Sequence, residues 1–378
     1  MSYTYNVRLF SLLACTACLL QVGAGCSGTE ENTPGEKKDM DMTIRFAAKG
    51  IPITRSTDPT GPAYEQFEDG AMLGVFAYTA NADDGTYTTP DLLYNGTLTK
   101  QTLEGLVSYQ CNPAAHWPTT GKAMFAAYYP YNGSVAEGSI TLSPQSSPGL
   151  PLISLELGKE SGKIDFCVAT AGPLTPAPDA SSPTDIVERE ENYVNFIFHR
   201  KLAEVVFRGK TTNLNDLTKL YINAVRIRNV HKAGTYDLNT DTWSTSDNVD
   251  AVSGATIKMA TGGSPMPDDK FDYIINPGSA NASDASIVMI PQEYDNVEFE
   301  ITYTLEYLKP SGGCEYRIVG TKRTPLTVEW KPGYRYYYDL EFGFYEAESE
   351  KVNFKFDARL AGKDTPTWIE KEIETEIK

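Results

Sequence analysis

The six cysteines are the side chains of this chain best able to form covalent bonds. Cys15 and Cys18 lie in an apolar N-terminal run, and Cys26 follows that run directly. Three more are spread along the rest of the chain: Cys111, Cys167 and Cys314. Three cysteines do not make a disulfide framework, although the residue types leave one pair among them open. Cys167 stands in an apolar stretch and is expected to be a small buried side chain.

Cys26 is the cysteine whose surroundings predict a reaction. An apolar core of secretory length precedes it at Leu9–Leu20, small residues follow at Gln21–Gly25, and polar residues begin at Ser27. This pattern resembles a bacterial lipoprotein signal, which predicts cleavage before Cys26 and lipidation of its thiol. More than one acyl chain is enough for stable membrane anchoring. The alternative is an ordinary secretory signal with an incidental Cys26, and both alternatives predict export.

The residues typical of catalytic and metal sites are sparse. The three histidines, His116, His199 and His231, are not paired at a spacing of four, and the chain has no HExxH, GxSxG, Walker or GxGxxG motif. We therefore expect no enzyme activity, no metal and no cofactor. The formal net charge is −17, and Arg8 is the one charged residue of positions 1–25, so the exported chain carries −18. Such a charge argues against binding nucleic acid.

Extended strands are the elements that the sequence predicts. Met42, Ile44, Phe46 and Ala48 share one face of a strand, with Arg45 on the other. Met72–Tyr78 is apolar on both faces, which is typical of a central strand. Val297–Tyr307 alternates strictly, which predicts one core face and one solvent face that carries its glutamates. Asn95-Gly96 has the residue types of a tight hairpin turn.

The composition and the breaks along the chain divide it into five parts. The predicted fold class is all-β, with two tandem antiparallel β-sandwich domains that follow a signal peptide and a flexible tether. The predicted boundaries are 1–25 for the signal, 26–40 for the tether, 41–212 for the N-terminal domain, 213–362 for the C-terminal domain and 363–378 for a C-terminal tail.

Several of these runs, in this order, resemble the fimbrillin family of Mfa-like pilins, which are lipoprotein precursors of type V pili. The matching stretches are Met72–Tyr78, Trp117–Pro130, Phe198–Ala203, Gly234–Leu238 with Trp243, and Trp330–Leu340. The resemblance covers nearly the whole exported chain. It implies transthyretin-like sandwiches, an outer-membrane destination, other pilin subunits as partners, and polymerisation by strand donation.

In that family a protease cuts after an arginine near the N-terminus and removes the lipidated segment together with the first strand. Arg55-Ser56 fits this step, because it follows the strand of Met42, Ile44, Phe46 and Ala48 and lies among loop-forming residues. Arg45 is the alternative cleavage site, but it lies inside the predicted strand. The alternative for Arg55 itself is a loop arginine that is never cut.

The resemblance implies a donor strand from the C-terminal region, and two segments have suitable alternation. The tail places Ile369, Ile373 and Ile377 on one face, although a spacing of four also suits a short helix. Val352–Leu360 alternates as well and is expected to complete its own domain. The tail is therefore the expected donor, and its presence favours a shaft or minor shaft subunit over a tip.

A second function class stays open. A monomeric surface lipoprotein that binds glycans or captures nutrients would use exposed aromatic rings for stacking on sugars. Its candidates are Trp117, Trp243, Trp330 and Trp368. The favoured interpretation is a structural pilin precursor that is exported as a surface lipoprotein, polymerised into a fimbria, and able to bind a host or bacterial surface ligand.

Overall fold

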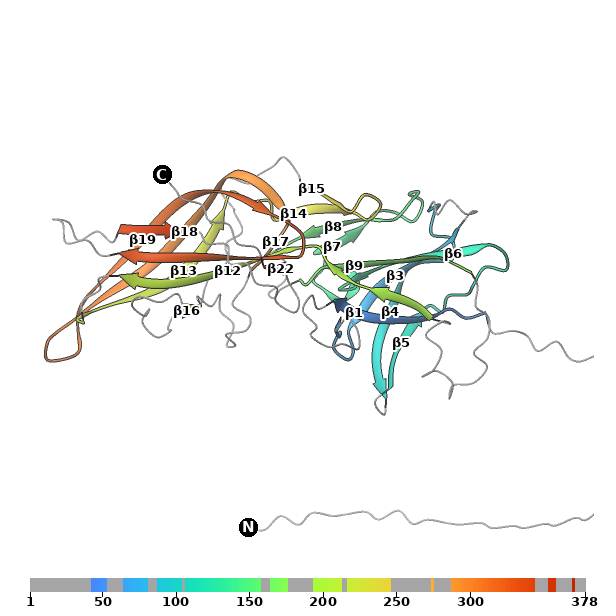
Figure 1. The fold of residues 1–378 in the computed structure, drawn as a ribbon, viewed down its shortest axis with the longest axis horizontal. Helices are drawn as coiled ribbons and strands as arrows, with labels where there is room; N and C mark the ends of the chain where they lie inside the picture. The colour runs from blue at the N-terminus through green and yellow to red at the C-terminus, as the bar shows by residue number, and fades with distance from the viewer. Residues whose placement is uncertain are drawn as a thin grey trace, which may run out of the picture. The chain divides into compact units, whose positions relative to one another are not determined.

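The structure, a computed structural model, is built from β-strands. It describes residues 42–52, 64–80, 87–103, 106–157, 164–175, 193–212, 216–245, 273–274, 287–343, 353–357 and 369–370. Within these ranges the helical structure is a single 3₁₀ turn at Asn132–Ser134, and no helix is long and apolar enough to cross a membrane. The predicted all-β class is confirmed (Figure 1).

The largest sheet has nine strands in the order β10-β1-β5-β4-β3-β6-β9-β11, with β2 paired to β1. Its strands are β1 (Arg45–Pro52), β2 (Tyr64–Glu65), β3 (Met72–Ala80), β4 (Leu93–Leu103), β5 (Leu106–Asn112), β6 (Lys122–Tyr129), β9 (Cys167–Leu174), β10 (Tyr193–Ile197) and β11 (His199–Arg200). β10 pairs with β1 and β11 pairs with β9, and Phe198 alone separates β10 from β11. One stretch of chain therefore joins both ends of the sheet, which closes on itself around a buried cluster.

We refer to this cluster as the inner core; it includes Phe46, Phe125 and Phe196. The opposite face of the same sheet packs on a second cluster, the middle core, which includes Phe76, Tyr128 and Tyr236. Side chains along β3 and β6 are buried on both faces. The prediction of a central strand at Met72–Tyr78 is confirmed, because that strand separates two cores.

A four-stranded sheet in the order β15-β14-β8-β7 covers the middle core. Its strands are β7 (Ile140–Leu142), β8 (Leu152–Glu156), β14 (Ala233–Asp237) and β15 (Thr242–Thr245). Rings of Phe166, Tyr236 and Trp243 pack together there with centroids 5.3–5.9 Å apart. The middle core is thus built by strands from distant parts of the sequence.

The remaining strands form two further sheets, in the orders β16-β12-β20-β21 and β13-β18-β19, with β17 paired to β12 and β22 paired to β20. The strands are β12 (Ala203–Thr212), β13 (Thr218–Arg228), β16 (Tyr273–Ile274), β17 (Ile287–Met289), β18 (Gln292–Leu308), β19 (Cys314–Trp330), β20 (Tyr334–Gly343), β21 (Asn353–Asp357) and β22 (Ile369–Glu370). Apolar residues of both sheets form the C-terminal core, which includes Phe207, Phe299 and Tyr338.

Strands pair across the predicted domain boundary between residues 212 and 213. β12 precedes the boundary and pairs in parallel with β20 over nine residues, whereas β14 follows it and pairs with β8. The division into domains 41–212 and 213–362 stays a prediction, and the pairing shows that neither segment holds all the strands of its own sheets.

Two local predictions are wrong in an informative way. Asn95-Gly96 lies inside β4 instead of forming a hairpin turn, although Asn95 does have a positive φ of 50°, next to a register shift between β3 and β4. Glu300 lies on the predicted solvent face of β18 but is only 3% exposed. Arg226, Arg228 and Arg323 surround its carboxylate and cover it.

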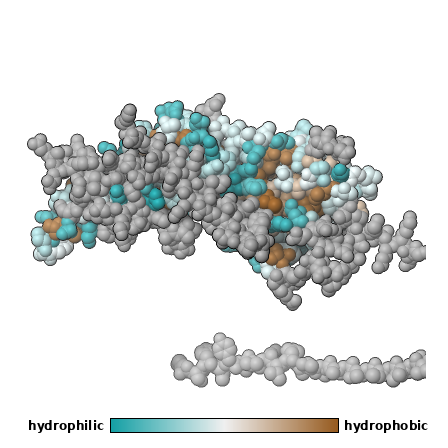
Figure 2. Space-filling view, viewed as in Figure 1, coloured by the Kyte–Doolittle hydropathy of each residue, from teal (hydrophilic) through white to brown (hydrophobic). Residues whose placement is uncertain are grey.

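The surface of the described residues mixes polar and apolar side chains, as Figure 2 shows for one face. The exposed large hydrophobic side chains of the described residues lie on several elements, with two of them on β19: Val107, Leu152, Ile197, Leu217, Tyr316 and Val319.

Candidate functional site: strand β1 and the wall that it completes

β1 lies between two strands that come much later in the chain. It runs parallel to β10, with Phe46 opposite Val194 and Ala48 opposite Phe196. Its antiparallel contact with β5 is a single register pair, Phe46 with Tyr109. β1 therefore completes the wall of the closed sheet, and its ladder to β10 is the longer of the two.

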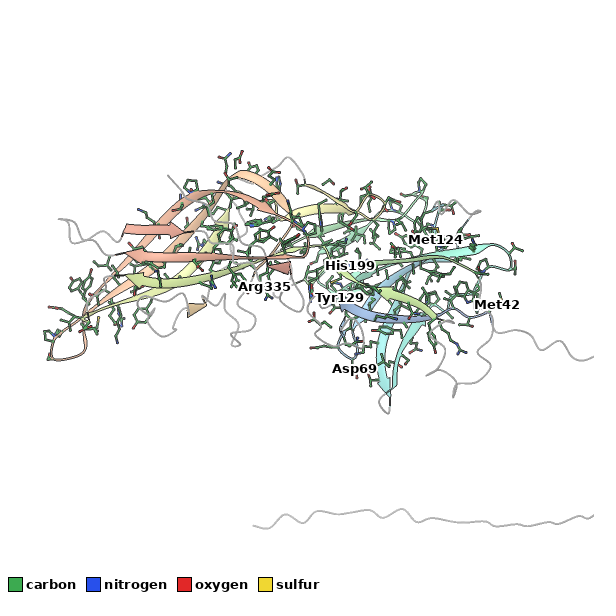
Figure 3. All side chains as sticks on the ribbon, in the orientation of Figure 1. Met42, Asp69, Met124, Tyr129, His199 and Arg335 are labelled. Carbon is green, nitrogen blue, oxygen red and sulfur yellow. The ribbon has the colours of Figure 1, made fainter. Side chains whose placement is uncertain are left out.

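The chain just before β1 extends this pairing. The Ile44 N–H donates to the Ala115 carbonyl at 2.8 Å, and the Trp117 N–H donates to the Met42 carbonyl at 2.8 Å. Met42 packs against the inner core at the start of the strand, where Figure 3 labels it. On the side that faces β5, two backbone hydrogen bonds to residues 115 and 117 therefore add to the single register pair of Phe46 with Tyr109.

The alternate side chains of β1 enter the inner core. Ile44 and Phe46 are each 2% exposed and Ala48 is 7% exposed. The Phe46 ring stacks on Phe196 with centroids 6.1 Å apart and meets Phe125 edge-on at 5.8 Å. The site is therefore a row of positions that holds large, large and small side chains in that order.

The end of β1 is shaped by Gly50. Its φ is +94°, the register with β10 shifts between Ala48 and Gly50, and a Cβ placed there would lie 2.1 Å from the carbonyl oxygen of Glu65. Only glycine fits such a close backbone approach. Beyond this point Ile51 and Pro52 pair with β2.

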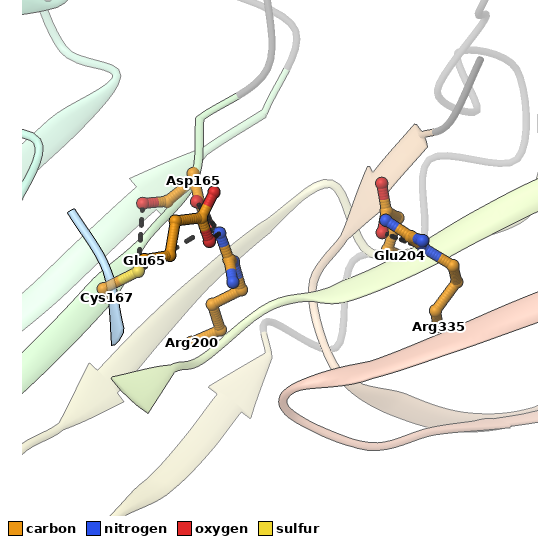
Figure 4. Close-up of polar contacts among 6 residues, drawn as sticks. All are labelled: Glu65, Asp165, Cys167, Arg200, Glu204 and Arg335. Carbon is orange, nitrogen blue, oxygen red and sulfur yellow. Dashed lines mark hydrogen bonds and ion pairs between the residues drawn. The ribbon is translucent and has the colours of Figure 1, made fainter. Parts of the chain in front are cut away.

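A buried cation of β11 ties β2 to the segment just before β9 near this end of the wall (Figure 4). Arg200 is bidentate to Asp165, with Nε–Oδ1 and Nη2–Oδ2 distances of 2.8 and 2.7 Å, and its Nη2 also lies 2.8 Å from Oε2 of Glu65. Its side chain is 6% exposed. The planar guanidinium matches two carboxylates at once, as a buried arginine can.

Two titratable groups near Arg200 have shifted pKa values. Burial raises the pKa of the Cys167 thiol well above its ordinary value, and this thiol lies 3.6 Å from Oδ1 of Asp165. Burial and the charge of Lys201 lower the pKa of His199. A thiol with a raised pKa is a poor nucleophile, so the arrangement favours packing over reaction.

The other sequence-predicted residues are placed as follows. Cys26, Arg55, Ser56, Ile373, Ile377 and Trp368 lie outside the described residues. Ile369 lies in β22, where its backbone pairs in parallel with Tyr334 of β20. Cys111, Cys167 and Cys314 are free cysteines. The structure therefore brings together the β1 residues and leaves the processing and donor residues as predictions.

The three tryptophans that the structure describes, among the four that could stack on sugars, are buried or half-buried. Trp117 is 5% exposed and Trp330 is 2% exposed. Trp243 is half-buried and donates from Nε1 to the Lys201 carbonyl at 2.7 Å. Within the described part of the chain, no three His, Cys, Asp or Glu residues gather where they could hold a metal ion.

The sequence missed the cluster of Arg200, Asp165 and Glu65. Asp165 lies 35 positions before Arg200 and Glu65 lies 135 positions before it, so no local pattern links the three residues. The one signal was Arg200 itself, a charged residue between the apolar positions Phe198 and Leu202, both fully buried. A charge at such a position is usually paired.

Known proteins resemble this chain in sequence and in fold. A model of the fimbrillin-like family matches residues 54–357. A protein of Bacteroides uniformis named “Putative fimbrium subunit Fim1C” is 26% identical over 236 residues, which cover 60% of this chain and 65% of that protein, so the match spans less than two thirds of the relative. A crystal structure of a fimbrial protein from Bacteroides vulgatus aligns with a TM-score of 0.55 and 17% identity, covering 84% of this chain and 99% of that one. This last likeness concerns the fold alone.

Proposed function

Since the chain belongs to the fimbrillin-like family, we propose that it is a structural subunit of a surface fimbria. It is exported as a lipoprotein anchored through Cys26 in the outer membrane. It is then processed near Arg55 and polymerised with other pilin subunits by strand donation.

The position of β1 is the observation that carries this proposal. β1 is one strand of a closed wall, and it fills the inner core with Ile44, Phe46 and Ala48. Its loss would leave β5 and β10 as two unpaired edges on either side of an apolar groove. An open edge of this kind is a template for a strand from another chain.

The stabilisation available from refilling the groove is large. Full burial of an Ile or Phe side chain is worth about 1.5–3 kcal/mol each. A donated strand with similar side chains recovers that burial and also the backbone hydrogen bonds to β10. Strand donation would therefore give strong association between subunits.

The segment that follows β1 in the sequence is the better place for the cut. Arg45 is paired with Tyr193 within the ladder between β1 and β10, so a protease could reach its peptide bond only after the strand separates. Arg55-Ser56 follows the last paired residue of β1, Pro52. The family match begins at residue 54, beside this position.

The donor belongs to the C-terminal region of the neighbouring subunit. Two segments compete for this role: the tail with Ile369, Ile373 and Ile377, and residues 352–360. The presence of such a C-terminal region favours a shaft or minor shaft subunit, and a surface ligand would be bound by the assembled fimbria.

Limited proteolysis tests the proposal. We expect an Arg-specific protease to convert the purified precursor into a shorter product that starts at Ser56 and forms SDS-resistant ladders. Arg55→Ala should stay uncut and monomeric, whereas the matched variant Arg45→Lys should be processed like the parent. A product that starts at Ser56 and stays monomeric would overturn the proposal and favour a monomeric binding protein.

A further inference from the structure

Residues 352–361 repeat the sequence of the strand that lies beside β1. They read VNFKFDARLA, and residues 194–203 read VNFIFHRKLA, with identical residues at six of ten positions. In the second stretch Val194, Phe196 and Phe198 are all fully buried in the inner core. In any extended strand the corresponding Val352, Phe354 and Phe356 would share one face, because alternate residues do. The C-terminal segment thus carries the side chains that already suit this core.

The same segment also matches β1, the present occupant of the wall. Its apolar face, with Val352, Phe354, Phe356 and Ala358, follows the same size order as Met42, Ile44, Phe46 and Ala48. The outer positions agree as well, because Arg45 and Lys49 correspond to Lys355 and Arg359.

Side-chain size selects one register. With Phe356 in the place of Phe46, the small Ala358 takes the place of Ala48. A shift by four residues would put Phe354 there instead, and overpacking of a dense core is destabilising. In this register Leu360 corresponds to Gly50. The correspondence between the two segments ends there, because the Cβ of Leu360 would clash with the carbonyl oxygen of Glu65.

The tail fits the groove less well. A strand that directs Ile369, Ile373 and Ile377 inward also directs Lys371 and Thr375 inward, because alternate residues share a face. Burying an unpaired lysine among phenylalanine rings is costly. The size and charge of the groove therefore disfavour the tail as its occupant.

Residues 353–357 form β21, the last strand in the order β16-β12-β20-β21. Among the described strands its pairing partner is β20. Its release would leave the nine-residue ladder between β12 and β20 in place. A strand at the end of a sheet can leave without opening the sheet.

We propose that residues 352–360 of a neighbouring copy take the place of β1, parallel to β10, with Phe356 in the position of Phe46. This assignment rests on the proposed function, since the groove opens only when β1 is removed. The inner core then keeps an aromatic ring between Phe125 and Phe196 in every assembled subunit.

Competing peptides test the identity of the donor. Four labelled peptides are added to the precursor before the Arg-specific protease: residues 350–362, the same peptide with Phe356→Asp, tail residues 366–378, and residues 40–52 as the reference occupant. We expect the 350–362 peptide to remain on the processed subunit and block ladder formation. The Phe356→Asp and tail peptides should need at least tenfold higher concentrations.

The outcomes separate the two proposals. A tail peptide that blocks ladders better than the 350–362 peptide would overturn the donor assignment and leave strand donation intact. A processed subunit that forms no ladder and binds not even the 40–52 peptide would overturn the proposed function itself.

An engineered disulfide tests the register. Ala47 lies opposite Asn195, and both residues are half-buried on the outer side of the wall. In the proposed register Asp357 takes the position of Ala47, so a chain with Asn195→Cys and Asp357→Cys should form disulfides between chains after processing. Asn195→Cys with Asn353→Cys reports the register shifted by four, and Asn195→Cys with Glu374→Cys reports the tail. Cross-linking of either control pair in place of the first would overturn the register or the donor.

Discussion

The inner core and the C-terminal core are closed in different ways. The inner core needs β1, a strand paired with β10 about 150 positions later and joined to β5 by one register pair. One wall of the C-terminal core is formed by β13, β18 and β19, in which β18 pairs with β19 from Gln292–Trp330 to Leu308–Cys314 and β13 pairs with β18. The other wall contains the parallel pair of β12 and β20. A wall that depends on one strand from the start of the chain can be opened by removing that strand, whereas the wall of β13, β18 and β19 is built around the continuous hairpin of β18 and β19.

Charged groups reinforce the same difference. Near the inner core a single cation, Arg200, contacts two carboxylates on separate segments. On the sheet of β13, β18 and β19 the arrangement is inverted, because one carboxylate, Glu300 of β18, contacts three arginines of the two flanking strands, two from β13 and one from β19. The first arrangement links segments that lie near β1, and the second links three strands that are paired side by side.

The largest expected effect comes from truncating the central phenylalanine of each core. Phe46→Ala and Phe299→Ala should each lower the free energy of unfolding of the precursor by about 3–5 kcal/mol, because each leaves a cavity in a packed core. Denaturant titration of the precursor measures both losses. After the proposed processing, Phe46→Ala should have no effect because residue 46 would have been removed, whereas the loss from Phe299→Ala should persist. An equal loss from both variants in the processed fibre would contradict the difference between the two cores.

Arg200→Leu tests the cation near the inner core. The change removes charge-assisted hydrogen bonds to Asp165 and Glu65, which are worth about 1.5–3 kcal/mol in buried settings. The matched control is Lys201→Met, since Lys201 pairs with an exposed Asp241 and such pairs contribute about 0–1 kcal/mol. Urea unfolding measures the free energy of unfolding of both variants. Equal losses of stability would show that the buried contacts of Arg200 contribute no more than the exposed pair of Lys201.

Acid should weaken the arginine-covered sheet through Glu300. Burial alone would raise the pKa of Glu300, but hydrogen bonds and charge from Arg228 and Arg323 outweigh it and lower the pKa below 4.5. These contacts therefore stabilise the fold above that ordinary value, and the stabilisation is lost as the pH falls through the lowered value. Glu300→Gln should flatten the decline of unfolding free energy between pH 5 and pH 3, measured by denaturant titration at each pH. Parallel curves for the two proteins would contradict this origin.

The smallest effect is expected at Val319, on the exposed part of β19. Its exposed fraction is 68%, so Val319→Thr should change the free energy of unfolding of the isolated subunit by less than about 0.5 kcal/mol. Thermal unfolding checks this value. A loss above 1 kcal/mol would show that this part of the long hairpin is less independent than its exposure indicates.

Local patterns in the sequence determined much of the strand content. The two-sided apolar run at Met72–Tyr78 predicted a central strand, and the structure puts it between two cores. Alternation also placed Phe299 and Ile301 in a core. It failed for Glu300, because a strand pattern reports which side chains share a face and not which arginines lie across the sheet.

Those local patterns could not predict which distant residues pair with each other. Nothing near Phe46 indicates that its neighbour in the wall is Val194, and nothing near Arg200 indicates Glu65. Asn95-Gly96 shows the same limit at short range. Its positive φ was anticipated from residue type, but tertiary pairing uses it within a strand instead of at a turn.

The parallel ladder between β12 and β20 has a mechanical consequence. β12 follows β11 of the closed sheet after two residues. Its nine paired residues run in the same direction as those of β20. In a fibre of the proposed kind, tension would pull the start of β12 and the end of β20 in opposite directions. Such a load shears all the hydrogen bonds of the ladder together instead of peeling them one by one, which is the geometry in which β-strands resist force best.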